Sequence, residues 1–585
     1  MQSNIFLIVN GTLTMETQKV FALAYLCWIA CLLPVICQED FNTVGSTVER
    51  TAYHFQPPKN WMNDPNGPMF YKGLYHLFYQ YNPKAAVWGN IVWGHAVSKD
   101  LINWKSLEFA IIPSEWYDIK GCWSGSATLL SGENPVILYT GWDNSSRQVQ
   151  NMVVPQNSSD PYLRKWMKIP ENPIIVPDNG INGSSFRDPT TAWLGKDGRW
   201  RILVGNKEDQ HHNGRALLYI SKDFVHWTKK KHPLHSSKKT GMWECPDFYP
   251  VAKLGKLGLD TSTNGPDVKH VLKVSLDDTK YEYYTVGTYF TGIDIYVPDN
   301  TSADNKYGLR YDYGKFYASK TFFDNHKKRR ILWGWINESD SMQDDIAKGW
   351  SGVQAIPRTI WLDNASKSQL VQWPVSKLES LHGHKIYKEN INLDTGSTIE
   401  IAGLTAAQAD VEVSFNLPSL ADVEKMDANL DAQQLCSQDG AATKTIVGPF
   451  GLLVLASKDL AEQTAVFFRV GVHQNKMKVL MCSDQSRSSL KTDVDKTTYG
   501  SFVSFSFNQK SISLRVLVDH SIVESFGEGG KTCITARVYP NQAIGEDAHL
   551  YLFNNGVSSV TASKLTAWDM VSSQQPSHTI RAYEL

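Results

Sequence analysis

A weak internal repeat constrains the fold of this chain more than any other feature. The segment Ser-Lys-Asp-Leu-Ile-Asn-Trp at residues 98–104 returns as Ser-Lys-Asp-Phe-Val-His-Trp at residues 221–227. Residues 126–141 and 190–205 also share a pattern, and short strand-like runs bounded by turns fill the region between them. Repeating four-stranded units are typical of a β-propeller. The pattern therefore predicts an all-β propeller, and a β-sandwich with long loops is the alternative.

The pattern changes after Trp373-Pro374. Apolar and polar residues alternate strictly at 410–417, 465–472 and 501–508. Such alternation is typical of strands with one buried and one wet face, as in a β-sandwich. We place the boundary near residues 375–390, which gives a first domain at 50–375 and a β-sandwich at 385–585. The polar stretch 420–435 suits either a helix or a long loop.

Residues 1–37 have the features of a secretory signal peptide. Lys19 precedes an apolar run that extends from Val20 to Cys37 and is followed by acidic residues. Met15, just ahead of Lys19, would give a conventional start. The run is at the lower limit for spanning a bilayer, so cleavage is preferred to an uncleaved anchor. We expect secretion to the apoplast or cell wall, with the vacuole as the alternative, and no stable membrane association after cleavage.

The cysteines and glycosylation sequons agree with secretion. Five cysteines follow the predicted signal, an odd number that allows at most two bridges. Cys436 and Cys482 flank a strand-rich stretch and are the predicted disulfide. Asn-x-Ser/Thr sequons, which accept N-linked glycans, occur at Asn144, Asn157, Asn182, Asn300, Asn337 and Asn364.

Composition narrows the range of partners. The chain has 58 Lys and Arg against 59 Asp and Glu, a balance that argues against nucleic acid as the main partner. It has no Cys/His cluster with ligand spacing and no Gly-rich phosphate loop ahead of a helix, so neither a metal nor a cofactor is predicted. We expect a monomer whose 19 tryptophans pack between sheets or stack on sugars.

Three short motifs each carry one carboxylate. Asp64 lies in Trp-Met-Asn-Asp-Pro-Asn-Gly (61–67), Asp188 in Phe-Arg-Asp-Pro (186–189) and Glu244 in Trp-Glu-Cys-Pro (243–246). Alone, each is usually structural, because Asp is common in turns and Arg-Asp pairs are common on surfaces. Glu244 stands in apolar company, where desolvation would raise the pKa as a general acid requires. Convergent carboxylates in tryptophan-rich surroundings are what glycosidic bond cleavage needs.

Taken together, these motifs resemble the plant acid β-fructosidases of glycoside hydrolase family 32. The resemblance covers nearly the whole chain after residue 50. It includes Trp-Gly-His (93–95), Trp-Ser-Gly-Ser (123–126), Leu-Arg-Tyr-Asp-Tyr-Gly (309–314), Trp-Gly-Trp (333–335) and Asp-His-Ser (519–521). It implies a five-bladed β-propeller that carries the active site and is followed by a β-sandwich.

The resemblance also implies roles for the three acids. Asp64 would be the nucleophile that attacks the anomeric carbon of a terminal fructosyl unit. Glu244 would protonate the leaving oxygen and then activate water, in a retaining two-step scheme. Asp188 would hold the fructosyl hydroxyls, and Arg187 beside it would keep Asp188 ionised. Substrate-binding positions implied for the pocket are Trp61, Asn63, Gln80, Trp88, Trp123, Ser124 and Arg187.

The substrate depends on finer features of the resemblance. Pro246 matches the branch that holds cell-wall invertases and fructan exohydrolases. In sucrose-cleaving relatives an Asp follows a Gly-Thr-Tyr segment, with Lys three residues on, and the Asp holds the glucosyl half of sucrose. This chain has Phe290 and Ile293 there, and an aromatic ring could stack on a further fructosyl unit.

The sequence therefore predicts a fructan exohydrolase that releases terminal β-fructofuranosyl residues from levan or inulin. A cell-wall invertase acting on sucrose is the alternative. A propeller that binds fructan without cleaving it is a third possibility, which the intact set of three acids disfavours.

Overall fold

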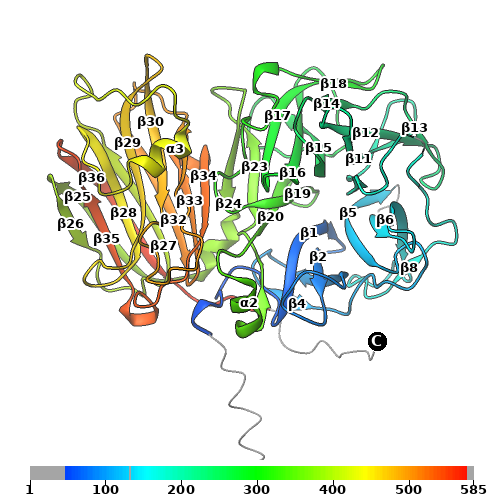
Figure 1. Cartoon of the computed structure of the whole chain (residues 1–585), viewed down its shortest axis with the longest axis horizontal. Helices are drawn as coiled ribbons and strands as arrows, with labels where there is room; N and C mark the ends of the chain where they lie inside the picture. The colour runs from blue at the N-terminus through cyan, green and yellow to red at the C-terminus, as the bar shows by residue number, and fades with distance from the viewer. Residues whose placement is uncertain (1–46, 131–133, 179, 576–585) are drawn as a thin grey trace, which may run out of the picture. The chain divides into compact units, whose positions relative to one another are not determined.

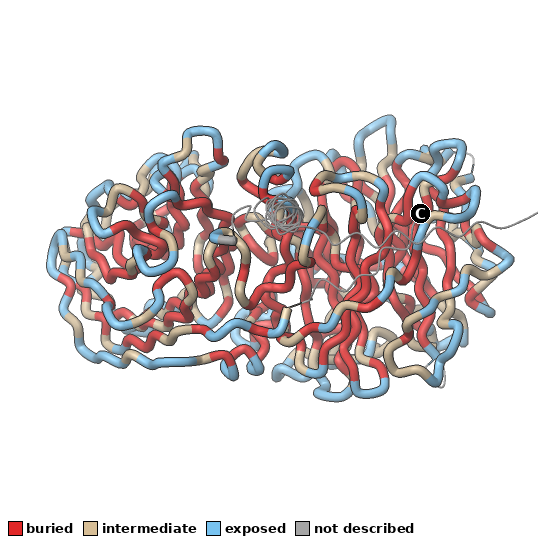
Figure 2. Tube along the Cα trace, turned by 90° about the horizontal axis from the view of Figure 1, so that it is seen from below, coloured by how far each residue is buried: buried red, intermediate tan, exposed pale blue. Residues whose placement is uncertain are grey.

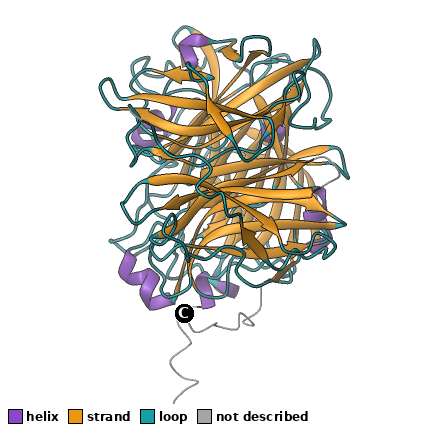
Figure 3. Ribbon diagram, turned by 90° about the vertical axis from the view of Figure 1, so that its right-hand side faces the viewer, coloured by secondary structure: helices purple, strands orange, loops and turns teal. Residues whose placement is uncertain are grey.

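The computed structural model describes residues 47–130, 134–178 and 180–575, so the predicted signal peptide lies outside the described residues. Strands make up most of the regular structure (Figure 3). The described helices are short: α2 (Met342–Lys348), α3 (Ala432–Gln438) and the 3-10 turns η1 (Thr47–Glu49), η2 (Thr301–Ala303), η3 (Ser376–Leu381), η4 (Glu528–Gly530) and η5 (Gly545–Asp547). No helix in the described part is long and apolar enough to cross a membrane.

Residues 60–374 form five antiparallel sheets, the blades of a β-propeller, coloured blue to green in Figure 1. Blade 1 holds β1 (Asn60–Tyr71), β2 (Leu74–Asn82), β3 (Val92–Ser98) and β4 (Trp104–Ser106). Blade 2 holds β5 (Gly121–Leu130), β6 (Asn134–Trp142), β7 (Gln148–Pro155) and β8 (Trp166–Lys168). Blade 3 holds β9 (Phe186–Arg187), β10 (Trp193–Leu194), β11 (Trp200–Glu208), β12 (Asn213–Ser221), β13 (Trp227–Lys229) and β14 (His235–Ser237).

The last two blades follow the same order. Blade 4 holds β15 (Trp243–Ala252), β16 (Val268–Leu276), β17 (Tyr281–Phe290) and β18 (Ile295–Pro298). Blade 5 holds β19 (Tyr317–Asp324), β20 (Arg329–Ile336), β22 (Val353–Gln354), β23 (Arg358–Leu362) and β24 (Leu370–Pro374). β21 (Trp350–Ser351) pairs in parallel with β1, so a late segment of the propeller is added to its first blade. This pairing closes the ring of blades.

The repeat in the sequence is a repeat in the structure. In blades 1 and 3 the segment connects the third and fourth strands, and Ser98 and Ser221 each accept a hydrogen bond from the backbone N–H three residues on. Trp104 and Trp227 each return their indole N–H to the carbonyl oxygen three residues before, at 3.1 and 3.0 Å. The two turns are therefore equivalent devices that fold the outer strand of a blade back onto its neighbour.

Residues 382–570 form two six-stranded sheets, coloured yellow-green to red in Figure 1. One sheet holds β25 (His382–Leu393), β36 (Val560–Met570), β27 (Gln408–Asn416), β32 (Ser511–Asp519), β33 (Ile522–Gly527) and β34 (Thr532–Arg537). The other holds β26 (Ser397–Glu400), β35 (His549–Asn554), β28 (Val447–Ala456), β29 (Thr464–His473), β30 (Lys476–Asp484) and β31 (Tyr499–Val503). Together with the propeller, this β-sandwich confirms the predicted fold class.

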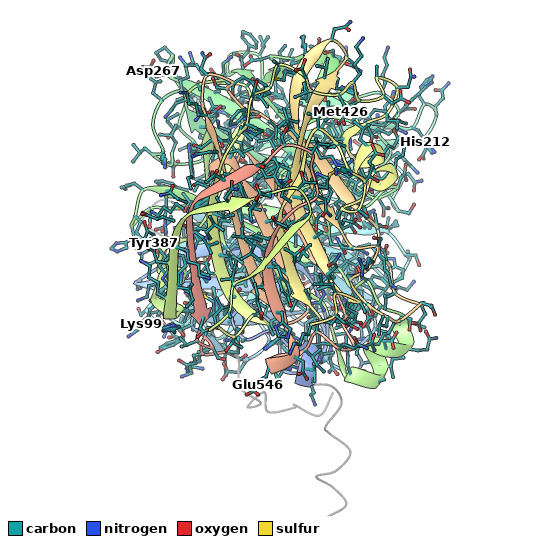
Figure 4. The ribbon with its side chains drawn as sticks, turned by 90° about the vertical axis from the view of Figure 1, so that its left-hand side faces the viewer. Lys99, His212, Asp267, Tyr387, Met426 and Glu546 are labelled. Carbon is teal, nitrogen blue, oxygen red and sulfur yellow. A yellow bond between two sulfur atoms is a disulfide. The ribbon has the colours of Figure 1, made fainter. Side chains whose placement is uncertain are left out.

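Apolar side chains from both sheets of the sandwich share one core, and buried segments dominate both parts of the chain in Figure 2. The edge strand β25 is mostly polar and mostly exposed to solvent. Its Tyr387, labelled in Figure 4, is 49% exposed. Of the polar stretch 420–435, only its last four residues enter a helix, α3. α3 carries Cys436, which is bonded to Cys482 of β30, as predicted. Cys122, Cys245 and Cys533 are free and buried.

Buried charges join the propeller to the sandwich. His54 lies 2.8 Å from a carboxylate oxygen of Asp519 and 3.2 Å from one of Glu524. Arg358 of β23 donates to Glu524 at 2.9 Å and to Asp312 at 2.9 Å. All five side chains are fully buried, so each half of the chain neutralises charges of the other.

Candidate active site

The three predicted acids meet where the innermost strands of the blades begin. Asp64 lies near the start of β1, Asp188 directly follows β9, and Glu244 is the second residue of β15. Cys245 links two of them: its backbone N–H donates to Asp188 at 2.8 Å, and its thiol lies 3.5 Å from Asp64 and 3.6 Å from Asp188. The motifs are separated by more than fifty residues in sequence, and the closure of the propeller brings them together.

Irregularities in the backbone near the three acids determine where their side chains point. The pairing of β1 with β2 shifts register between Met62 and Pro65, and that of β15 with β16 shifts between Glu244 and Asp247. Asp188 and Cys245 both adopt left-handed backbone conformations, with φ of 67° and 43°. Bulges and left-handed non-glycine residues turn side chains away from the regular alternation of a strand and concentrate at functional sites.

Asp64 accepts from three donors, the Ser124 hydroxyl, the Asn63 amide and the Cys245 thiol. The Ser124 hydroxyl donates to one carboxylate oxygen at 2.5 Å, and the Asn63 amide donates to the other at 3.0 Å. Trp61 donates in turn to the Asn63 carbonyl oxygen at 2.8 Å, which fixes the orientation of that amide. Burial raises the pKa of Asp64 and Glu244 adds to the rise, whereas the bonds from Ser124 and Asn63 oppose it.

Asp188 is fully desolvated, and burial raises its pKa to about 7. Arg187 lowers that pKa, while Glu244 and Asp64 raise it further. The expectation that Arg187 keeps Asp188 ionised is therefore wrong, because desolvation outweighs the cation. The guanidinium is directed elsewhere, to Glu244 and Asp277.

Glu244 is surrounded by donors and not by apolar groups. Arg187 donates to one of its oxygens at 2.9 and 3.1 Å, and the Tyr317 hydroxyl donates to the other at 2.5 Å. The Lys280 ammonium lies 3.5 Å from that second oxygen. Trp243 and Cys245, which flank Glu244 in sequence, are buried. The groups that contact the Glu244 carboxylate come instead from residues distant in sequence.

Sequence reasoning missed the role of four residues in this site. Cys245 donates hydrogen bonds to the acids, and Asp277, Lys280 and Tyr317 lie around Glu244 and Arg187. Asp277 and Lys280 occupy the turn between β16 and β17, where Asp277 accepts from Arg187 at 3.0 Å and from Lys280 at 2.5 Å. Both are partly exposed, by 39% and 56% of the side chain. The only signal for them was the spacing itself, an Asp with a Lys three residues on.

Aromatic rings and one amide complete the predicted pocket. Trp88 is 52% exposed and packs edge-on against Trp123, whose other neighbour is Trp142. Trp61 contacts Trp335 of blade 5 in the same edge-on manner. Gln80, on β2, donates to the Cys122 carbonyl oxygen at 3.2 Å, beside Trp123. The six predicted pocket positions other than Arg187 therefore all come from blades 1 and 2, on the side of Asp64.

Phe290 is not part of this site, which corrects the prediction. It is the last residue of β17 and pairs with Ile295 across the hairpin to β18. Glu244 pairs with Ser275, and Ser275 with Glu282 at the opposite end of β17. Eight residues at about 3.3 Å each separate Glu282 from Phe290, roughly 26 Å along the strand. Counting along the sequence could not show at which end of the blade the ring lies.

Among the described residues, one group of carboxylates is close enough to hold a metal ion: Glu338, Asp340 and Asp345. Lys348 already contacts all three of these side chains, and Arg537 lies 2.6 Å from Glu338. Two cations of the protein itself thus satisfy this cluster, which does not fit a metal site.

A propeller with three carboxylates at its centre and a tryptophan-lined rim is the architecture of a glycosidase, and the comparisons name the family. Residues 54–374 match the glycosyl hydrolases family 32 N-terminal domain, and residues 377–569 match the family 32 C-terminal domain. The chain belongs to glycoside hydrolase family 32 and is a hydrolase of fructosides.

Some of its relatives are named β-fructofuranosidases and others are named fructan exohydrolases. It is 60% identical over 508 residues to the cell wall isozyme of β-fructofuranosidase from Pisum sativum, covering 86% of this chain and 91% of that one. It is 57% identical over 531 residues to a fructan 6-exohydrolase from Beta vulgaris, covering 90% and 87%. Fructan 1-exohydrolase IIa from Cichorium intybus shares its fold with a TM-score of 0.88 and 52% identity, covering 91% of this chain and 99% of that one.

Proposed function

We propose that the chain is a retaining β-fructofuranosidase in which Asp64 is the nucleophile and Glu244 the acid and base. Asp64 attacks the anomeric carbon of a terminal fructosyl unit while Glu244 gives its proton to the leaving oxygen. Glu244 then takes a proton from water, which releases fructose from Asp64. Asp188, whose pKa burial raises to about 7, binds fructosyl hydroxyls, and in its ionised form it stabilises the oxocarbenium-like transition state.

The surroundings of Glu244 support its role. Arg187, Lys280 and Tyr317 hold both carboxylate oxygens in place, so the side chain is fixed in one orientation before substrate binds. Its side chain is nevertheless 18% exposed, whereas Asp188 is buried. An acid that serves the leaving group must reach toward the open side of the pocket, and Glu244 does so.

Sucrose is the substrate that the site favours. Asp277 and Lys280 stand beside Glu244 on the open side, where the leaving group departs. They have the spacing of an Asp with a Lys three residues on, the pair that was sought at Phe290 and Ile293. A carboxylate and an ammonium at this place can bind the hydroxyls of a leaving glucosyl unit. This observation carries the proposal.

Fructan is the second candidate substrate. The exposed Trp88 beside Trp123 offers a stacking surface for further sugar units. The Beta vulgaris and Cichorium intybus relatives are named as fructan exohydrolases. Terminal fructosyl release from inulin or levan is therefore expected alongside sucrose hydrolysis.

Kinetics on matched substrates test this proposal. We expect the unmodified enzyme to cleave sucrose, and Asp277→Ala to lower kcat/KM for sucrose by about 10- to 100-fold, the loss of a hydrogen bond to a charged group. The loss on inulin and levan should be smaller. Lys99→Gln, at an exposed lysine outside this site, is the control and should leave both activities unchanged. An equal fall on sucrose and fructan in Asp277→Ala would remove the reason for preferring sucrose.

We also propose secretion to the cell wall. The predicted signal peptide supports this location, as does the name of the Pisum sativum relative, a cell wall isozyme. The sequons at Asn144, Asn157, Asn182, Asn300 and Asn364 lie at exposed positions, where glycans can be accommodated, and Asn337 is half-buried. A fluorescent fusion of the full chain, imaged after plasmolysis, should follow the wall and not the vacuole.

A further inference from the structure

Blades 3 and 4 enclose a second cavity at the end of the propeller opposite the acids. Its volume is about 460 Å³. It lies between the β10–β11 turn, the β17–β18 turn and the loop at 261–264 that leads toward β16. We call it the interblade pocket. Its residue His270 pairs with Pro250, six residues along β15 from Glu244, which is roughly 20 Å. The pocket is thus separate from the active site.

An ion-pair network forms the floor of the interblade pocket. Arg201 lies 2.7 Å from Asp294 and 2.9 Å from Asp197, and the Tyr289 hydroxyl donates to Asp294 at 2.6 Å. Arg201 and Asp294 are almost fully buried. Every nitrogen of the Arg201 guanidinium already donates to a carboxylate or a carbonyl oxygen. The floor is therefore rigid and cannot offer an arginine fork to a ligand.

The rim of the interblade pocket carries an excess of positive charge. Its lining has four cationic residues, Lys196, Arg199, Arg201 and Lys230, and two carboxylates, Asp197 and Asp294. This leaves two positive charges in a chain whose formal net charge is −1. Burial lowers the pKa of the remaining titratable lining group of basic type, His270, to about 4, so it adds no charge near neutral pH. Lys196 is exposed, and Lys230 is 38% exposed and 3.7 Å from Asp294.

Hydroxyl groups share the rim with these cations. Thr261, Ser262, Thr263 and Asn264 line one wall and can donate to and accept from a polar ligand. Phe290 and Ile293 of the adjoining β17–β18 hairpin are 47% and 63% exposed and do not line the pocket. Hydroxyl donors next to lysines are suited to a ligand with hydroxyls and dispersed negative charge.

We propose that the interblade pocket binds an acidic oligosaccharide of uronic acid units. Lysine ammonium groups at the rim meet the carboxylates as point charges, and the 261–264 wall meets the hydroxyls. A compact anion such as phosphate is a poorer match, because the one buried guanidinium is fully used by Asp197 and Asp294. The site anchors the enzyme to an acidic polysaccharide and leaves the catalytic pocket free.

Titration of the full-length protein with trigalacturonate tests this proposal. We expect saturable binding that weakens as salt is raised, and at least a tenfold weaker affinity for the fully methyl-esterified trisaccharide, which keeps the rings but loses the charges. Inorganic phosphate at the same concentration should not displace the trisaccharide. Displacement by phosphate, or equal binding of the methyl ester, would overturn the proposal.

Variants locate the binding. Lys196→Gln with Lys230→Gln should lower the affinity for trigalacturonate about tenfold or more, and Phe290→Ala, outside the lining, should leave it unchanged. The control pair Lys99→Gln with Lys458→Gln, two exposed lysines outside the pocket, should change nothing. Fructoside hydrolysis should stay at its normal rate in all three proteins, which shows that they are folded. Unchanged affinity in the variant of the two pocket lysines, or an equal loss in the control pair, would contradict the assignment.

Discussion

Arginines of blade 3 and carboxylates of blade 4 form a network at each end of blade 4, and the two networks differ in exposure. At one end Arg187 joins Glu244 and Asp277, whose side chains are 18% and 39% exposed. At the other end Arg201 joins Asp294, and both are about 5% exposed. A sealed pair of this kind holds structure together, whereas the partly open pair can meet a substrate. The same residue types therefore serve stability at one end and chemistry at the other.

The largest expected effect is at the open end. Asp64→Ala should abolish fructoside hydrolysis, because no group remains to form the covalent intermediate. The melting temperature should not fall, since the raised pKa of Asp64 shows that burial opposes its charge in the native state. Initial rates and thermal melts on the same protein measure both. Activity within tenfold of the unmodified enzyme would refute the nucleophile.

Replacing each of the two arginines by glutamine, in separate variants, tests the comparison between the two ends directly. Arg201→Gln should destabilise the protein by about 3–5 kcal/mol, because Asp294 is left buried without its cation, while kcat changes little. Arg187→Gln should instead lower kcat sharply, with a smaller loss of stability, because Glu244 and Asp277 reach solvent. Chemical denaturation and steady-state kinetics give the two readouts. Equal effects of both variants on stability would mean that exposure does not separate the two ends.

The pH dependence of Asp188 gives the next effect. A carboxyl whose pKa is raised to about 7 in the native state binds its proton more tightly there than in the unfolded chain. Stability is therefore present below about pH 4 and is lost as pH rises through 7. Asp188→Asn cannot lose a proton, so it should be more stable than the unmodified protein at pH 8, by up to about 4 kcal/mol, and equal to it at pH 4.

Thermal melts at the two pH values decide this prediction. A variant that is equally stable to the parent at pH 8 would show that Asp188 is ionised without cost in the native protein.

The smallest expected effect is at Tyr317. Tyr317→Phe removes one of the donors that hold Glu244 and keeps the ring, so kcat should fall by about 10-fold, in line with one hydrogen bond to a charged group. An unchanged kcat would show that this hydrogen bond does not position Glu244 for catalysis.

Local patterns in the sequence predicted much of this structure. Ser98 and Ser221 form the same turn because a Ser hydroxyl and a backbone N–H three residues on meet in any such segment, whatever surrounds it. The acids were found because Pro, Asn and Gly beside them restrict the backbone at short range. Cys436 and Cys482 were paired from their setting among strands.

The contacts that could not be predicted depend on how the propeller closes. Tyr317 reaches Glu244 across 73 residues, and its own neighbours in sequence give no sign of that contact. Phe290 was placed at the wrong end of its strand because a motif fixes which residue is present and not which edge of the sheet it occupies. The apolar neighbours of Glu244 misled because the groups that contact its carboxylate, Arg187, Lys280 and Tyr317, are distant in sequence.

The buried ions at His54, Arg358, Asp519 and Glu524 tie the stability of the propeller to the β-sandwich. Cutting after residue 374 would remove both carboxylate partners of His54 and one of the two carboxylate partners of Arg358, which would keep Asp312. Removing one partner of a buried ion pair costs about 3–5 kcal/mol, a large part of the net stability of a typical domain. The β-sandwich thus contributes none of the three acids but neutralises charges buried in the half that does.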